Sequence, residues 1–160
     1  HNCAMVLGSR AQTWTALAEH KKALADWDRL LEVVGPTEAD KYRFWRGMTL
    51  IRLGDHRRSS ADIEKALRRV DISHDERYNC VCIFSLAAAA ALSDGHLSEA
   101  QRRKAADGYA ARALDVLSQL RQAGYFKTLT AWLHLGTDPD LAALRSREDF
   151  RRWCLNPPTR

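Results

Sequence analysis

The sequence predicts an all-α protein built of helical hairpins, and three observations support this prediction. Apolar residues recur at spacings of three and four along the 160 residues, whereas the strict alternation of a half-buried strand is almost absent. The chain is 46% apolar and 28% charged, which is typical of a globular domain with one core. Glycine and proline interrupt the helical pattern where short turns between helices are expected.

The first helical hairpin is predicted over residues 1–35. Polar residues 19–22 separate its two helices, and Gly35-Pro36 ends it, because glycine accepts a left-handed cap and proline cannot continue the hydrogen-bond ladder. Apolar positions recur on one face of each helix. They are Ala4, Leu7, Ala11, Trp14 and Ala18 in the first, then Ala23, Trp27, Leu30, Leu31 and Val34 in the second.

The second hairpin is predicted over residues 38–71, with helices at about 39–53 and 57–70 and Gly54-Asp55 as the turn. We expect its inward side chains to be Tyr42, Trp45, Leu50, Ile63, Ala66, Leu67 and Val70. The charged residues of its second helix are expected on the solvent-facing side. These are Arg57, Arg58, Glu64, Lys65, Arg68 and Arg69.

The third hairpin is predicted over residues 76–124 and is longer than the other two. A loop at 93–96 separates its helices, and the second of them is expected to begin at Ser98. Ser98 and Gln101 predict a capping box, in which each side chain satisfies one of the unpaired amides of the first helical turn. Gly124 is expected to end this helix.

Residues 125–160 are predicted to form a C-terminal cap that covers the last apolar face of the hairpins. Helices are expected near residues 128–135 and from Pro139 and Arg147. The side chains suited to this covering role are Leu129, Leu133, Leu141, Leu144, Phe150 and Trp153.

Four carboxylates and four arginines crowd residues 136–153 and raise the question of a catalytic site. Asp138 is predicted to be an N-cap, with Pro139 in the first helical position, where a missing amide hydrogen costs nothing. Ser146 and Asp149 predict a further capping box. We therefore interpret these carboxylates as two helix beginnings rather than as an acid and base pair.

The first two hairpins repeat one another. Their second helices align Ala23, Trp27 and Leu30 with Ser59, Ile63 and Ala66, and their first helices align Ala11 with Gly47 and Trp14 with Leu50. The offset is close to the tetratricopeptide period of about 34 residues. Helices approach closely only where neither carries a bulky side chain, and large residues fill the space beside the contact. The chain therefore resembles tetratricopeptide (TPR) repeats, which form a right-handed α-α superhelix.

The order of the later motifs makes the resemblance more specific. They are Tyr78–Ala87, Tyr109–Leu117, Ala123–Phe126, Asp138–Leu141, Leu144-Arg145 and Asp149-Phe150. In this order they resemble the TPR segment at the C-terminal end of large bacterial multidomain serine/threonine protein kinases, over essentially the whole chain. That family usually has Asn-Leu-Ala-Cys where this chain has Asn79-Cys80-Val81-Cys82. The resemblance implies a single TPR-like domain over residues 1–160.

The function implied by this resemblance is protein–protein interaction at the concave surface that the first helix of each hairpin lines. The expected partner-binding residues are Gln12 and Thr15; Lys41, Phe44, Met48, Ile51 and Arg52; and Glu76, Asn79, Ile83 and Leu86. Their apolar and basic character suits an extended or helical peptide with some acidic character. The alternative is a structural spacer or homodimerisation unit that has no separate peptide ligand.

Other functions find no support in the sequence. The glycine-rich loop and catalytic Asp residues of a kinase are absent, so we expect no enzymatic activity from these residues. Cys80 and Cys82 lie on different faces of a helix and are not expected to share a metal, and no cofactor motif occurs. The net charge of +5 is spread along helices without a groove-reading motif, so no nucleic acid is expected.

We also expect no membrane span, because no stretch is apolar and long enough. The four cysteines show no regular spacing, which favours free thiols in the cytoplasm.

Overall fold

The computed structural model describes residues 2–155; His1 and residues 156–160 of the predicted cap lie outside it. Every regular element within the described residues is a helix, so the prediction of an all-α fold is confirmed. The contacts divide the chain into two compact units, residues 1–72 (unit 1) and residues 73–160 (unit 2). That a single domain spans the chain stays a prediction.

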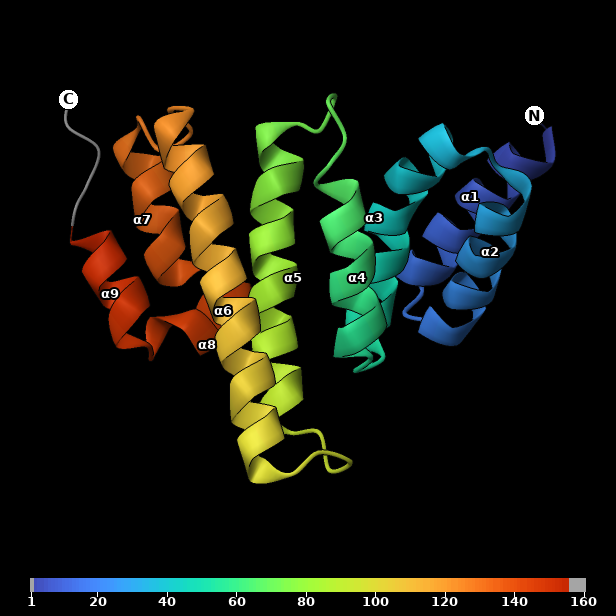
Figure 1. The fold of residues 1–160 in the computed structure, drawn as a ribbon. Coiled ribbons are helices and arrows are strands. Elements are labelled where there is room, and N and C mark those ends of the chain that lie inside the picture. Colours follow the sequence, from blue (N-terminus) through green and yellow to red (C-terminus); the bar gives the residue numbers. More distant parts are fainter. Residues whose placement is uncertain (1, 156–160) are drawn as a thin grey trace. The chain divides into compact units, whose positions relative to one another are not determined.

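Unit 1 consists of two successive helical hairpins, drawn in blue to green in Figure 1. The helices are α1 (Asn2–Ala16), α2 (His20–Val33), α3 (Pro36–Arg52) and α4 (His56–Ala66). Within the unit α1 packs on α2, α2 on α3, and α3 on α4. The predicted pairing of these helices is therefore confirmed.

The two hairpins of unit 1 share the same backbone turn at an offset of 36 residues. Ala18 and Gly54 adopt positive φ angles of 58° and 80° at equivalent places. The following amides make equivalent bonds, from Glu19 to the Trp14 carbonyl at 2.8 Å and from Asp55 to the Leu50 carbonyl at 3.0 Å. Ala18 was predicted to continue the apolar face of the first helix; it lies beyond the end of α1 and is exposed instead, because it forms this left-handed turn.

The end of α4 also differs from the prediction. The helix ends at Ala66, and the amides of Arg68 and Arg69 make tight bonds to carbonyls three residues earlier. Arg69 then donates to Asp71 at 3.0 Å. The chain has left the helix by Val70, which is fully exposed rather than inward.

A charged pair joins the two helices of each hairpin. Arg10 donates to both carboxylate oxygens of Asp26, at 2.7 and 2.6 Å, and Arg46 does the same to Asp62, at 2.6 and 2.9 Å. Both aspartates are buried, and the pairs are again 36 residues apart. Arg46 also donates to Asp28 of α2 at 2.8 Å, so one guanidinium connects three helices. The hydrogen bond from Arg10 lowers the pKa of Asp26.

The two helices of the second hairpin approach each other closely at Gly47, as predicted from its small size. A Cβ atom at Gly47 would lie 2.8 Å from Cδ1 of Ile63 and 3.4 Å from the carbonyl oxygen of Ser59. The Ser59 hydroxyl donates to the Gly47 carbonyl at 2.8 Å. The equivalent residues of the first hairpin, Ala11 and Ala23, are fully buried. The small-residue alignment between the two hairpins is therefore confirmed.

Unit 2 begins with a long hairpin and ends in shorter helices (Figure 1). Its elements are α5 (His74–Leu92), α6 (Glu99–Gln122), α7 (Leu129–Thr137), the 3-10 helix η1 (Pro139–Leu141), α8 (Ala142–Arg145) and α9 (Glu148–Cys154). α5 packs along α6 and also contacts η1 and α8. The predicted helix starts near residues 128 and 139 agree with the structure.

The predicted capping box at the start of α6 is confirmed. The Ser98 amide donates to Gln101 Oε1 at 2.9 Å, and the Gln101 amide donates to Ser98 Oγ at 3.3 Å. Ser73 and Glu76 form a second box at the start of α5, with distances of 2.9 and 3.1 Å. The same local pattern could have predicted it.

The capping box predicted from Ser146 and Asp149 is wrong. Arg147 is the N-cap of α9, and Ser146 donates instead to the Ala143 carbonyl at 3.2 Å. Arg147 draws Asp149 away from the capping role, because its guanidinium donates to Asp149 and, at 2.6 Å, to Asp107 of α6. The hydrogen bond from Arg147 lowers the pKa of Asp149.

The six apolar tail residues predicted to cover the core differ in burial, and Trp153 among them is half-buried. Three are buried as predicted: Leu141, Leu144 and Phe150. Leu129 and Leu133 were also predicted to cover the core but are 72% and 59% exposed. They lie four residues apart and so share one face of α7, whereas the buried Leu135 lies on another.

Among the residues described, none of the helices combines the length and the apolar character needed to span a bilayer.

Replacing Gly47 with alanine tests the close approach, and Gly108→Ala is the matched control. Both glycines lie inside helices, but a Cβ at Gly108 meets nothing within 4 Å. Gly108→Ala is expected to raise the free energy of unfolding by about 0.5–1 kcal/mol. Gly47→Ala is expected to lower it by about 1 kcal/mol or more, since Ile63 must move. Urea unfolding followed by circular dichroism measures both; equal stabilisation would contradict the close approach.

The Arg10–Asp26 pair predicts a pH dependence. Because the folded-state pKa of Asp26 is lowered, its stabilisation is complete above the ordinary carboxyl pKa of about 4 and is lost as pH falls through the folded value. Asp26→Asn should therefore be less stable than the wild type at neutral pH and equally stable at strongly acidic pH. Thermal unfolding across this pH range measures the difference. The exposed Glu32→Gln variant should differ little from wild type throughout.

Candidate functional site

In unit 1, α3 presents an accessible stripe that contains three of the predicted partner-binding residues. Lys41, Met48 and Arg52 are spaced seven and four residues apart and therefore share one face of the helix. Lys41 and Arg52 are exposed, and Met48 is half-buried. An apolar side chain thus lies between two basic groups on this face, which we call the α3 stripe.

The other predicted partner-binding residues of unit 1 differ in their exposure to solvent. Phe44 and Ile51 are only 2% and 8% exposed, so they belong to the core beneath the α3 stripe. Gln12 of α1 is exposed. Thr15 is half-buried, and its hydroxyl donates to the Ala11 carbonyl of its own helix at 2.9 Å.

In unit 2, the predicted residues of α5 also divide by exposure. Asn79 is exposed and Leu86 is half-buried, whereas Ile83 is 3% exposed. Glu76 is occupied by its capping role, because its carboxylate accepts from the Ser73 amide. The accessible predicted residues on α5 are therefore fewer than those on α3.

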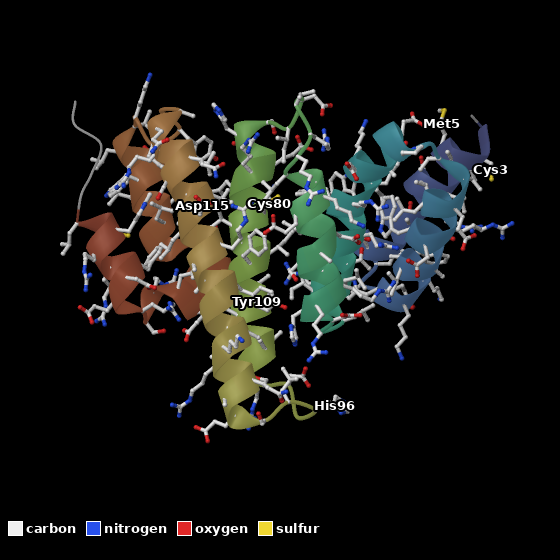
Figure 2. All side chains as sticks on the ribbon, in the orientation of Figure 1. Cys3, Met5, Cys80, His96, Tyr109 and Asp115 are labelled. Carbon is white, nitrogen blue, oxygen red and sulfur yellow. The ribbon has the colours of Figure 1, made fainter. Side chains whose placement is uncertain are left out.

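An open hollow of about 620 Å³ runs along α1, lined by Met5, Val6, Arg10 and Trp14 among others. Met5 and Val6 are 68% and 61% exposed. Figure 2 labels Met5 and the exposed Cys3 near the start of this helix. Among the described lining residues, Arg10 is the arginine, and it is already bonded to Asp26.

A polar cluster in unit 2 surrounds the carboxylate of Asp138, which is 8% exposed. Tyr78 and Cys82 of α5 both donate to its Oδ2, at 2.9 and 3.6 Å. The amide of Asp140 donates to Oδ1 at 2.9 Å, as expected for the predicted N-cap. His134 Nε2 lies 3.4 Å from Oδ2. Sequence reasoning predicted the cap but missed its partners on α5, because they lie 56 and 60 residues away.

Aromatic rings enclose this cluster. The ring of Tyr78 lies 5.9 Å from Tyr125, 6.4 Å from Phe126 and 5.7 Å from the His134 ring. Burial raises the pKa of Tyr78 above its ordinary value, and the hydrogen bond to Asp138 adds to the effect. The phenol therefore stays protonated and donates to the carboxylate.

The chemistry of the Asp138 cluster does not favour nucleophilic catalysis. Burial raises the pKa of the Cys82 thiol, and the charge of Asp138 raises it further. A cysteine nucleophile needs a lowered pKa, since the thiolate is the reactive form. The cluster thus acts as a hydrogen-bonded anchor between α5 and the start of η1.

The same cluster contains a set of atoms that could ligate a metal. One ligand atom from each of Cys82, Asp138 and Asp140 lies within 4.8 Å of the others. Zinc would require the Cys82 thiolate, which its raised pKa opposes. The carboxylate of Asp138 also already accepts three hydrogen bonds. The donor set therefore fits the anchor better than a metal.

The anchor is tested by removing one hydroxyl from each of two tyrosines. Tyr78→Phe takes a donor from the buried Asp138, so it should lower the free energy of unfolding by about 1–3 kcal/mol. Tyr125→Phe is the matched control, because Tyr125 donates to the exposed Asp75 at 2.8 Å and its loss should cost clearly less. Urea unfolding compares the two variants, and equal losses would refute the anchor.

The α3 stripe thus contains three of the predicted partner-binding residues, and the Asp138 anchor contains the predicted N-cap. Comparison of the chain with protein-family models, curated proteins and solved structures finds no match.

Proposed function

We propose that the chain is a non-catalytic protein-interaction module built of TPR-like hairpins, which binds a peptide with acidic character. The observation that carries this proposal is the repeated hairpin of unit 1, whose α3 stripe stays accessible. Equivalent turns, charged pairs and small-residue contacts recur at 36 residues. Repeated hairpins of this kind stack into extended surfaces that bind partners.

The chemistry of the α3 stripe supports an acidic partner. Lys41 and Arg52 offer positive charge on both sides of Met48, whose thioether adapts to irregular apolar shapes. A peptide with apolar residues flanked by carboxylates complements this arrangement. Gln12 and Thr15 of α1 are further candidates for contact in the same unit.

The proposal also concerns the larger protein to which the chain would belong. The order of motifs from Tyr78 to Phe150 supports a place at the C-terminal end of a bacterial serine/threonine protein kinase. In this proposal the module recruits partners, and catalysis belongs to another part of the protein. The satisfied Asp138 cluster, with its raised thiol pKa, supports a non-catalytic role for unit 2.

Homodimerisation is the alternative, and the hollow along α1 favours it. Its exposed Met5 and Val6 are apolar, and burial of such residues against a second copy would be favourable. Sedimentation velocity across a concentration series distinguishes the two functions. A dimer that Met5→Asp dissociates would favour the alternative.

The proposed peptide binding is tested by selecting random peptides displayed on phage against the full chain. We expect the selected peptides to carry net negative charge. Lys41→Glu combined with Arg52→Glu should weaken the binding of a selected synthetic peptide at least tenfold in calorimetry, because both attractive charges are reversed.

The matched control combines Lys65→Glu near the end of α4 with Arg68→Glu in the turn that follows it, two exposed positions that give the same change in charge within unit 1. This control should bind as the wild type does. Equal weakening by both double variants would reduce the effect to net charge and refute the α3 stripe as the site.

A further inference from the structure

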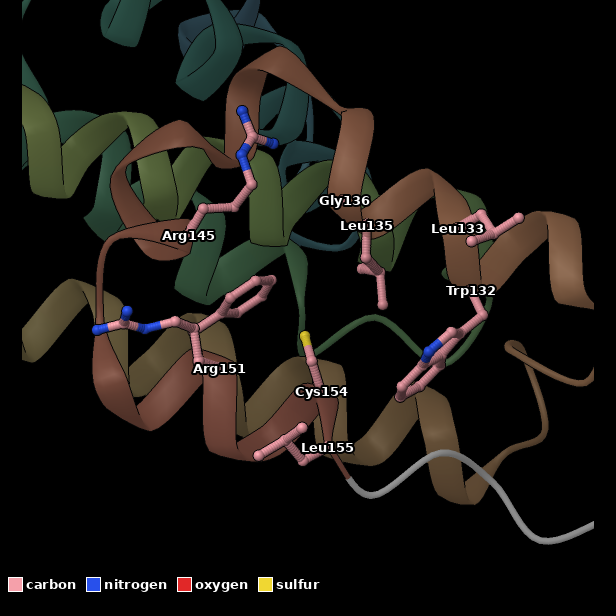
Figure 3. Close-up of a pocket in the computed structure, with 9 residues that line it drawn as sticks. Trp132, Leu133, Leu135, Gly136, Arg145, Arg151, Cys154 and Leu155 are labelled. Atoms are coloured by element: carbon pink, nitrogen blue, oxygen red, sulfur yellow. The ribbon is translucent and has the colours of Figure 1, made fainter.

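An apolar hollow of about 580 Å³ lies between the short C-terminal helices of unit 2 (Figure 3). α7 and α9 provide most of its lining, and α8 contributes one arginine. The residues that matter here are Trp132, Leu133, Leu135, Arg145, Arg151 and Leu155. In Figure 3 the two arginines lie on one side of the hollow and Trp132 lies on the other. The hollow therefore combines an apolar wall with a basic side.

One wall of the hollow is held firmly in place. The indole of Trp132 stacks on that of Trp153, with ring centroids 5.4 Å apart. Trp153 donates from Nε1 to Ser118 of α6 at 2.9 Å, and the guanidinium of Arg121 lies 4.4 Å from its ring centroid. This wall is thus fixed to the long α6 helix before any partner arrives, which lowers the entropic cost of binding.

The apolar surface continues beyond the hollow along α7. Leu129, Leu133 and Gly136 are spaced four and three residues apart and share one face of the helix. Both leucines are exposed, and a Cβ at Gly136 would meet nothing within 4 Å. Leu155 at the end of α9 is 79% exposed. The stripe on α7 and the hollow form a longer apolar surface than one small ligand would cover.

The two arginines of the hollow lack a carboxylate partner among the described residues. Arg145 donates to the backbone carbonyl of Asp138, and Arg151 to that of Ser146 at 3.4 Å. Their neighbours differ, since Arg147 bonds to Asp107 and Asp149 and Arg152 bonds to Glu148. Two uncompensated guanidinium groups beside an apolar wall are suited to a carboxylate on an apolar ligand.

We infer that this hollow docks an amphipathic segment of a partner protein, whose apolar side chains enter between α7 and α9 and whose Asp or Glu pairs with Arg145 and Arg151. The inference rests on the proposed interaction function and adds a second site to it, in unit 2 rather than on the α3 stripe. The length of the α7 stripe favours a helical segment, which places apolar residues at matching spacings of three and four.

The test uses the full chain and peptides selected from a random phage-displayed library. Gly136→Leu places an apolar side chain at the hollow, where an added Cβ meets nothing within 4 Å, and Arg151→Glu reverses one charge at an exposed position. Arg152→Glu on the same helix is the matched control for charge. Circular dichroism confirms that each variant folds as the wild type does.

We expect one class of selected peptides to carry apolar residues at helical spacing and at least one carboxylate. Their dissociation constants should rise at least tenfold with Gly136→Leu and with Arg151→Glu. They should stay unchanged with Arg152→Glu and with the Lys41→Glu and Arg52→Glu double variant. A peptide whose carboxylate is replaced by lysine should regain binding to Arg151→Glu.

The outcomes separate this inference from the proposed function. If every selected peptide ignores Gly136→Leu but is weakened by the α3-stripe variant, the inference is overturned and the proposed function stands. If no peptide is selected, both the inference and the proposed function are refuted. Binding to phosphatidylglycerol vesicles that Gly136→Leu abolishes would assign the hollow to a membrane surface and would also overturn the inference.

Discussion

The charged pair between the two helices of each hairpin is the interaction on which unit 1 depends. A buried carboxylate is costly unless a hydrogen-bonded cation accompanies it, so Asp26 and Asp62 fix where Arg10 and Arg46 must lie. That requirement sets the register of one helix against the other. The left-handed turn and the small-residue contact lie at the same sequence separation from the charged pair in both hairpins. Arg46 extends the effect to a third helix through Asp28.

Unit 2 is organised by a different kind of polar interaction. Its organising carboxylate, Asp138, is held by neutral donors from Tyr78 and Cys82 instead of by a bidentate guanidinium. Rings from α5, α7 and the segment before α7 surround it. Such a centre joins elements far apart in sequence, whereas each pair in unit 1 joins adjacent helices. Contacts from Arg147 to Asp107 and from Trp153 to Ser118 hold α9 to α6, and among the described residues the hollow between α7 and α9 remains open.

Local signals predicted the helices and several of their caps, because both depend on residues close in sequence. Ser98 with Gln101 and Asp138 with Pro139 were found this way. Prediction failed where distant groups compete. Asp107 of α6 recruits Arg147, which in turn occupies Asp149, and no spacing near Ser146 reveals this. The pair of Arg10 and Asp26 could have been found, because the repeat places Arg46 and Asp62 at the same offset. The hollow between α7 and α9 could not have been predicted from the sequence, because the exposure of Leu133 depends on tertiary packing.

The stacked indoles of Trp132 and Trp153 have an optical consequence. Their ring centroids are 5.4 Å apart and the rings are inclined by 20°, so their electronic transitions are expected to couple. The other tryptophans all belong to unit 1, at positions 14, 27 and 45. Emission and near-ultraviolet dichroism from the two units therefore carry different signatures. The chain contains its own spectroscopic label for each unit without any added dye.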